Sequence, residues 1–236
     1  MEGIMKDLIK CDGLCKRYGH NVALWNFSVE IPAGRIIGIL GPNGSGKTTL
    51  IKTLSGILSV DSGTALICGK EIGTESKKLV SYLPERPYFS ASLKVKDTLK
   101  FFEDFYEDFR REVAEEMLKT LQIDVNSKIG SLSKGTREKV QLVLVMSRKA
   151  KVYLLDEPMG GVDPAARDFI LKTILTNYNE DASVLISTHL ISDVEKVLDD
   201  VIFIKQGKMV LHKSVDDIRM EEKKSVDALF REVFAC

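Results

Sequence analysis

The sequence contains few cysteines, and their spacing excludes two kinds of site. Four occur in 236 residues, at Cys11, Cys15, Cys68 and Cys236. Cys11 and Cys15 suggest half of a metal site, but no second cysteine pair and no nearby histidine completes a ligand set. Four residues along a strand span about 13 Å, which is too far for a disulfide. We therefore expect all four to be reduced thiols.

Long apolar runs and an excess of one charge are also missing. No stretch approaches the ~20 apolar residues of a membrane-spanning helix, and residues 1–7 have no signal-peptide core. Lysine plus arginine equals aspartate plus glutamate at 34 each, so nothing indicates a nucleic-acid partner. With 44% hydrophobic and 29% charged residues, the composition is typical of a globular protein. We expect one soluble, cytoplasmic domain over residues 1–236.

The stretch from Gly41 to Thr49 is the strongest chemical signal in the chain. It fits the phosphate-loop pattern G-x-x-x-x-G-K-[ST], between an apolar strand at 35–40 and an amphipathic helix at 50–58. Glycines let the backbone approach an anion closely, and N–H groups at the helix start then point at a phosphate. Lys47 adds a cation for the outer phosphates, and Thr48 a hydroxyl for Mg²⁺. The alternative, a glycine-rich turn with a surface lysine, is disfavoured by the flanking strand and helix.

Strands are expected before and after this loop. Residues 7–14 and 22–31 are predicted strands joined by a turn, and shorter ones are predicted at 64–68 and 80–83. Tyr18 lies in the first turn. It could stack on a base or pack as a half-buried turn residue, and both alternatives stay open on the residues alone.

Helical patterns replace strand patterns after residue 87. Leu99, Phe102, Tyr106 and Phe109 fall on one helical face, with acidic residues on the others. We expect an inserted helical subdomain at 87–149 whose core is this aromatic stripe. The alternative is that part of the stripe is exposed as a docking surface.

A second helix start is predicted after residue 131. Ser133 is expected to cap a helix at 137–148. A helix N-terminus can hold an anion, but the residues alone favour a capped start without a ligand.

Two carboxylates follow a buried strand. The apolar run at 152–155 ends in Asp156 and Glu157. Buried charges are costly unless paired or bound to metal, and open α/β sheets bind ligands at this edge. Beside a phosphate loop, the pattern predicts Asp156 as a Mg²⁺ ligand and Glu157 as a base acting on water. The alternative is a strand that ends in solvent.

The last third of the chain adds one histidine to this edge. His189 follows a predicted strand at 183–187, and this placement favours a phosphate contact over a structural role. Asp163 is predicted to cap a helix that begins at Pro164. A hairpin at 201–212 and a charged helical tail at 214–236 follow, the tail lying outside or contacting other chains.

Together these motifs resemble the nucleotide-binding subunits of ABC (ATP-binding cassette) transporters, over about residues 9–212. Residues 41–49 are similar to the Walker A loop, 131–136 to the signature loop, 153–157 to Walker B and 161–163 to the D-loop. The resemblance implies an α/β fold of the P-loop NTPase class. This has a mixed sheet flanked by helices, an N-terminal antiparallel β subdomain and an inserted helical subdomain.

The resemblance also implies a mechanism. Two such subunits would meet head to tail and enclose two ATP molecules with Mg²⁺ between Walker A of one chain and the signature loop of the other. Glu157 would polarise the attacking water, and His189 would steady the γ-phosphate. Hydrolysis would drive a transmembrane permease and so hold the chain at the inner face of the membrane. The implied ATP-binding residues are Tyr18, Asn43, Gly44, Ser45, Gly46, Lys47, Thr48, Thr49, Ser133 and Gly135, and the implied metal ligands are Thr48, Asp156 and Glu85.

Three residues depart from the family pattern. Glu85 stands where the family has glutamine, and it adds a negative charge near the γ-phosphate. Lys134 and Thr136 stand where glycine and glutamine are common, although the Ser-x-Gly core is kept. These variants resemble the exporter branch of bacterial ABC ATPases.

Two other functions are compatible with parts of the pattern. One is a soluble ABC-type ATPase without a membrane partner, for example of the iron–sulfur-assembly type. The other is a nucleotide-gated binding module that does not hydrolyse, and Glu157 argues against it because it supplies a base.

Overall fold

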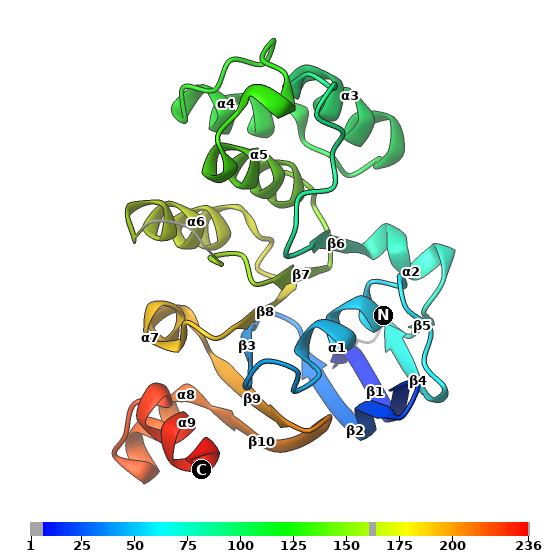
Figure 1. Ribbon diagram of the computed structural model, residues 1–236, viewed down its shortest axis with the longest axis vertical. Helices are drawn as coiled ribbons and strands as arrows, with labels where there is room; N and C mark the ends of the chain where they lie inside the picture. The colour runs from blue at the N-terminus through cyan, green and yellow to red at the C-terminus, as the bar shows by residue number, and fades with distance from the viewer. Residues whose placement is uncertain (1–6, 161–163, 236) are drawn as a thin grey trace, which may run out of the picture.

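The computed structural model describes residues 7–160 and 164–235, and Figure 1 shows their arrangement. A six-stranded sheet forms the centre, in the order β10-β9-β3-β8-β7-β6. Neighbours from β9 to β6 run parallel, and β10 returns antiparallel beside β9, so the expected mixed sheet is confirmed. The strands are β3 (Ile36–Leu40), β6 (Val80–Leu83), β7 (Val152–Asp156), β8 (Ser183–Thr188), β9 (Asp200–Lys205) and β10 (Lys208–Ser214).

The central strands are continuous buried runs. Every residue of β3, β7 and β8 is buried, as expected of parallel strands covered on both faces. In register, Leu40 lies beside Thr188, and Asp156 beside Ser187. The predicted phosphate loop, the two carboxylates and His189 therefore leave the sheet at the same edge.

A second, antiparallel sheet precedes and covers part of the first. Its order is β2-β1-β4-β5, with β1 (Asp7–Tyr18), β2 (Asn21–Pro32), β4 (Ser62–Ile67) and β5 (Lys70–Glu71). Apolar side chains of β1, β2 and β4 form one buried cluster with those of β3 and the following helix. This sheet confirms the expected N-terminal antiparallel β subdomain, and β1 extends further than predicted, as far as Tyr18.

Helices cover the sheet and extend from one end of it (Figure 1). None of those described is long and apolar enough to cross a membrane. Three helices, α3 to α5, gather at one end of the molecule. The helices are α1 (Lys47–Leu54), α2 (Thr74–Leu79), α3 (Val95–Phe105), α4 (Arg111–Thr120), α5 (Lys134–Met146), α6 (Pro164–Asn177), α7 (Ile191–Val194), α8 (Val215–Asp217) and α9 (Val226–Phe234), with short turns η1 (Ile129–Ser131), η2 (Glu195–Val197) and η3 (Ile218–Glu222).

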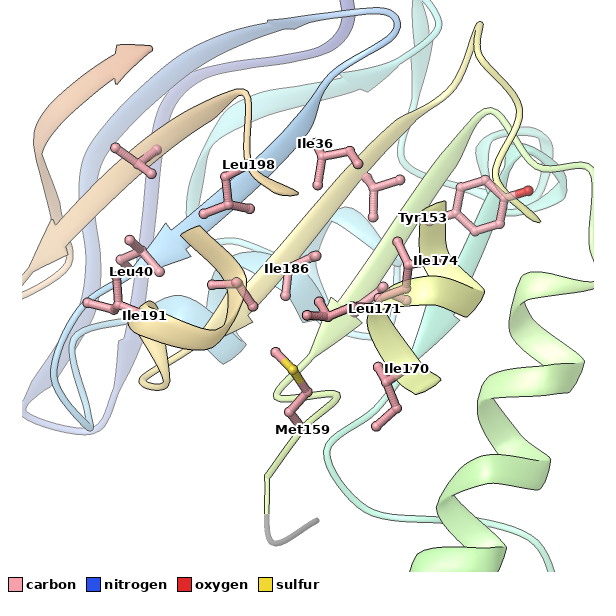
Figure 2. Packing of buried hydrophobic residues seen from close by; sticks show 14 of the residues in the cluster. Ile36, Leu40, Tyr153, Met159, Ile170, Leu171, Ile174, Ile186, Ile191 and Leu198 are labelled. Atoms are coloured by element: carbon pink, nitrogen blue, oxygen red, sulfur yellow. The ribbon is translucent and has the colours of Figure 1, made fainter. Parts of the chain in front are cut away.

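The main core lies between the six-stranded sheet and the later helices. Figure 2 shows Tyr153 and Ile186 from the sheet packing against Ile170 and Ile174 of α6. The same cluster continues through α7 to α9, where Leu229 is buried. The tail at 214–236, expected on the outside, thus contributes side chains to the core.

Helices α3, α4 and α5 bury a separate apolar cluster. Leu99 and Phe102 are buried in it, and the ring of Phe102 lies 5.3 Å from that of Tyr106 and 5.5 Å from that of Phe109. The stripe is a core, as expected. The prediction that all four side chains share one helical face was wrong. Helix α3 ends at Phe105, and Tyr106 and Phe109 lie in the connection to α4. The division of the chain at 87–149 stays a prediction.

Two predicted helix starts were too late. The helix placed at 50–58 begins at Lys47, directly after Gly46, whose φ is 115°. The helix placed at 137–148 begins at Lys134, directly after its cap Ser133. In both cases glycine and polar residues hid the first helical turn, because they have low helix propensity and lack apolar periodicity.

Candidate nucleotide-binding site

The loop between β3 and α1 begins and ends at glycines, Gly41 and Gly46, that leave no room for a side chain. A Cβ on Gly46 would lie 2.4 Å from the carbonyl oxygen of Ala23. A Cβ on Gly41 would lie 2.4 Å from the carbonyl oxygen of Ile204. The loop is therefore held tightly against β2 and β9. Helix α1 then begins at Lys47 with no side-chain cap, which leaves its first N–H groups for a ligand.

Lys47 lies buried along this loop. Its Nζ donates to the carbonyl oxygens of Gly41 at 2.8 Å and Pro42 at 3.3 Å, and lies 3.9 Å from a carboxylate oxygen of Glu157. Burial lowers the pKa of Lys47, and the carboxylates of Glu157, Asp156 and, third, Glu85 oppose that shift. The ammonium group is thus largely desolvated, and we expect a phosphate to be a favourable additional partner.

Asp156 ends β7 almost fully buried, at 1% exposure. Its Oδ1 accepts from the hydroxyl of Ser187 at 2.6 Å and from that of Thr48 at 3.1 Å. Its Oδ2 is buried and has no hydrogen-bond partner within the described chain. An unpaired buried carboxylate oxygen is destabilising unless something compensates it.

These groups fit a magnesium ion. The orphaned oxygen of Asp156 and the hydroxyl of Thr48 are hard oxygen ligands, which Mg²⁺ prefers. Mg²⁺ is usually held by one or two carboxylates plus substrate phosphates. Consistent with that pattern, residues 7–160 and 164–235 contain no cluster of three acidic, histidine or cysteine side chains able to hold a metal by themselves.

Glu157 occupies an unusual backbone conformation. Its φ is 49°, in the left-handed region that disfavours residues with a Cβ. The N–H of Glu157 donates to both the carbonyl oxygen and the hydroxyl of Ser187, each at 3.0 Å. Such a conformation costs about 1–3 kcal/mol and persists where the surroundings fix it, often at functional sites. Its Oε2 lies 2.9 Å from Nδ1 of His189.

A cleft of about 820 Å³ is lined by Lys47, Thr48, Glu157 and His189, and Asp156 lies buried behind Thr48. That volume is within the usual size of a small-molecule site. Tyr18, at the end of β1, is 49% exposed and lines the cleft, and Nζ of Lys16 lies 5.9 Å from the centre of its ring. Of the residues predicted to bind ATP or act on it, those lining the cleft are Tyr18, Asn43, Gly44, Ser45, Gly46, Lys47, Thr48, Thr49, Glu157 and His189.

Two of the predicted ATP contacts are not part of this cleft. Ser133 is exposed and caps α5, accepting from the N–H of Thr136 at 3.2 Å, as predicted. Gly135 has no atom within 4 Å of the position of an added Cβ. Lys134, between them, does line the cleft. The start of α5 is therefore capped within the chain, yet Ser133 is exposed and Gly135 has open space beside it.

The roles predicted for Glu85 and for residues 161–163, which resemble the D-loop, stay predictions. Glu85 follows β6, is exposed, and lines the cleft near Lys47. Its place in a metal shell stays a prediction. Residues 161–163, including Asp163, lie outside the described residues.

Sequence reasoning missed two residues that shape the site. The hydroxyl of Ser187 connects Asp156 to the backbone of Glu157. The only signal for it was a polar residue inside a predicted buried strand. Gly207, in the turn of the β9–β10 hairpin, donates its N–H to the carbonyl oxygen of Ser45 at 2.8 Å, and it has no room for a Cβ. Nothing local links this turn to the phosphate loop.

The fold and the site together define a P-loop nucleotide-binding protein. Comparison with known proteins specifies the family: the model for the ABC transporter family matches residues 24–160, and the chain belongs to this family. It is the ATP-binding subunit of an ABC transporter, and ATP hydrolysis is the activity of its class.

Relatives match over most of their length. An ABC transporter ATP-binding protein of Methanocaldococcus jannaschii is 33% identical, over 91% of this chain and 80% of that protein. The SkfA peptide export ATP-binding protein SkfE of Bacillus subtilis is 31% identical, over 86% of this chain and 87% of its own. A solved structure of the ATP-binding subunit of an ABC transporter superposes with a TM-score of 0.85 and 26% identity, over 96% of this chain and 99% of that one.

Proposed function

We propose that this chain binds Mg²⁺-ATP in the cleft, hydrolyses it together with a second nucleotide-binding subunit, and powers export through a separate transmembrane permease. The observation that carries the proposal is one cluster of contacts. Glu157 lies 3.9 Å from Lys47 and 2.9 Å from His189, beside the orphaned oxygen of Asp156.

The loop and Lys47 hold the triphosphate. Residues 44–49 line the cleft at the positive end of α1, and we assign the phosphates to the N–H groups there that have no partner inside the helix. Lys47 then exchanges one of its two carbonyl contacts for a phosphate oxygen. Tyr18 stacks on the base at the opposite end of the cleft.

Thr48 and Asp156 would hold a magnesium ion. Bound there, the ion would neutralise charge on the phosphate oxygens. The hydroxyl of Ser187 donates to one oxygen of Asp156, and the other oxygen, which has no partner within the described chain, would be free to bind the ion. Glu85, which lines the cleft, would be the third ligand.

Glu157 and His189 act on the attacking water. A carboxylate oxygen of Glu157 accepts a proton from the water that attacks the γ-phosphorus. Nδ1 of His189 holds the other carboxylate oxygen of Glu157, and His189 also contacts the γ-phosphate. As the water oxygen bonds to the γ-phosphorus, the bond between that phosphorus and the leaving ADP oxygen breaks. The protein's part is positioning and charge neutralisation rather than covalent chemistry.

The second subunit completes the site. Ser133 is exposed and Gly135 has open space beside its Cα, and both lie at the N-terminus of α5. We assign these groups to the γ-phosphate of an ATP bound on another copy of the chain. The two copies lie head to tail, so each closes the cleft of the other.

A second cavity of about 820 Å³ supports the proposed contact with the permease. It lies beside α3, and its aromatic lining includes Phe101 and Phe105, the latter 70% exposed. Lys52, Lys77 and Lys78 also line it. Aromatic and basic side chains together fit an amphipathic segment with acidic side chains, which would hold the chain at the inner face of the membrane. Export is proposed from the similarity to SkfE.

The variant Glu157→Gln tests the proposal. Glutamine keeps the shape of the side chain but cannot take the proton, so we expect hydrolysis to fall by roughly 10²–10⁴-fold while ATP stays bound. ATP should then convert the chain to a stable dimer, measured by light scattering. Glu75→Gln, on an exposed ion pair far along the sequence, is the matched control and should hydrolyse normally. Wild-type turnover by Glu157→Gln would remove Glu157 from the reaction.

A further inference from the structure

The carboxyl-terminal helix α9 contacts the segment that follows His189. His189 comes directly after β8, and α7 and η2 begin within a few residues of it. Helix α9 packs against α7, and Ile191 and Val194 of α7 lie in the same buried cluster as Val226 and Leu229 of α9. Helix α9 thus packs against the segment that follows His189, the residue proposed to contact the γ-phosphate.

One carboxylate connects the two segments. Glu195 is only 14% exposed at its side chain, and its oxygens accept from the N–H groups of Val226 at 3.0 Å and Asp227 at 3.4 Å. These are the first N–H groups of α9, which have no partner inside the helix. Ser225 supplies the next bond, to the N–H of Ala228. A carboxylate at this positive end is favourable, so Glu195 fixes α9 to the chain just beyond His189.

The other end of α9 packs against β9, the strand that pairs with β3 just before the phosphate loop. Phe230 and Phe234 lie 5.5 and 5.8 Å, ring to ring, from Phe203 of β9. Phe203 is paired in register with Leu40, the last residue before Gly41. The helix therefore spans from the strand beside the phosphate loop to the turn after His189.

We propose that Glu195 is a positioning residue. By capping α9 it holds α7 against the sheet, and thereby keeps Nδ1 of His189 within hydrogen-bond distance of Glu157. A group displaced by about an ångström can lose a large part of a positioning effect, so a small shift of α7 has a measurable kinetic effect. This inference rests on the role of His189 given under the proposed function.

A cycle of four proteins tests the proposal: the full wild-type chain, Glu195→Ala, His189→Ala and the double variant. The quantity measured is single-turnover hydrolysis of Mg²⁺-ATP at saturating nucleotide. We expect Glu195→Ala to lower the rate roughly tenfold with the apparent ATP affinity changed less than about twofold. In the His189→Ala background the same substitution should change nothing further, because the residue it positions is gone.

Two additional variants separate positioning from folding. Glu195→Gln keeps an oxygen for the N–H of Val226 and should restore most of the rate even if the alanine variant folds poorly. Glu232→Ala removes a carboxylate from the exposed side of the same helix, where it pairs with Lys224, and should leave the rate unchanged.

Each outcome decides one point. An equal loss from Glu195→Ala in both backgrounds would mean a purely structural role and overturn the proposal, as would no loss in the wild-type background. If His189→Ala itself hydrolyses at the wild-type rate, the role of His189 fails, and with it the premise of this inference. If His189→Ala is impaired but the effects multiply, only the positioning role of Glu195 is lost.

Discussion

The phosphate loop and the start of α5 both present a helix N-terminus, but they are built in opposite ways. The loop is packed against β2 and β9, and its Gly41 and Gly46 admit no side chain. The start of α5 is exposed, and Gly135 stands in open space. The phosphate loop is fully packed within one chain, whereas the start of α5 leaves space that a neighbouring molecule would fill.

The acidic groups of the two regions differ in backbone strain rather than in burial. At the sheet edge, Asp156 is buried with one oxygen unpaired, and Glu157 holds a strained backbone conformation. Near the start of α5, one oxygen of Glu138 lies 3.8 Å from the exposed Lys134, and the other is likewise buried without a partner within the described chain. Both regions thus contain an unpaired carboxylate oxygen, and the backbone strain at Glu157 is what distinguishes the edge where chemistry is proposed.

The largest difference is expected from replacing one glycine in each region. Gly46→Ala places a Cβ in a left-handed position against a backbone carbonyl, so we expect a loss of roughly 2–4 kcal/mol in the free energy of unfolding. Gly135→Ala lies in open space within α5 and should be neutral or stabilise by up to about 1 kcal/mol. Urea unfolding of both variants measures this. Equal losses would mean that the two regions are equally constrained.

Nucleotide affinity should separate the regions next. Lys47→Ala removes a buried cation from the triphosphate, and we expect ATP binding to weaken by roughly 2–4 kcal/mol. Ser133→Ala should leave ATP binding to the single chain unchanged, because Ser133 serves the neighbouring copy. Calorimetry on dilute, monomeric chain is the measurement. A comparable loss from Ser133→Ala would place the helix start inside the chain's own site.

The cap of α5 gives a smaller effect on stability. Ser133 accepts the N–H of Thr136, and its loss should cost about 1 kcal/mol in unfolding free energy. Ser225→Ala, at the equivalent cap of α9, is the matched comparison. Thermal unfolding of the two variants should give similar shifts; no shift for Ser133→Ala would mean that water replaces the cap at no cost.

The pH dependence of ATP binding is the smallest effect. Burial lowers the pKa of Lys47 in the free chain, and bound phosphates favour its charged form, so binding raises that pKa. ATP binding should therefore be accompanied by proton uptake as the pH approaches, from below, the pKa of Lys47 in the free chain. The affinity for ATP should fall as the pH rises through that pKa. Calorimetry in buffers of different ionisation enthalpy detects the uptake. Lys134→Ala should retain it, and its disappearance there would assign the proton to Lys134.

Much of the site could be predicted from the sequence because it is locally encoded. Glycine spacing, a serine before a helix and carboxylates after an apolar run each act within a few residues. The common edge also followed, since parallel strands end together. Ser133 and the strand bounds 80–83 were predicted as found.

The remainder depends on tertiary contacts that no local pattern encodes. Gly207 closes on Ser45 across more than 160 positions, and Ser187 joins Asp156 to Glu157 only once β8 lies beside β7. The tail was misplaced because its charged residues hid four buried apolar ones, Val215, Ile218, Val226 and Leu229. Amphipathic helices of this length gain most of their stability from packing, so composition alone did not place it.

The central claim is that ATP is held between the phosphate loop of one copy and the start of α5 of another. Mixing two inactive variants tests it directly: Lys47→Ala, and Gly135→Arg, whose side chain fits the single chain but fills the proposed contact. In a mixed dimer one site carries both defects and the other carries neither. The account predicts that mixing restores ATP hydrolysis to a substantial fraction of the wild-type rate. A mixture as inactive as its components, with dimers present, would contradict it.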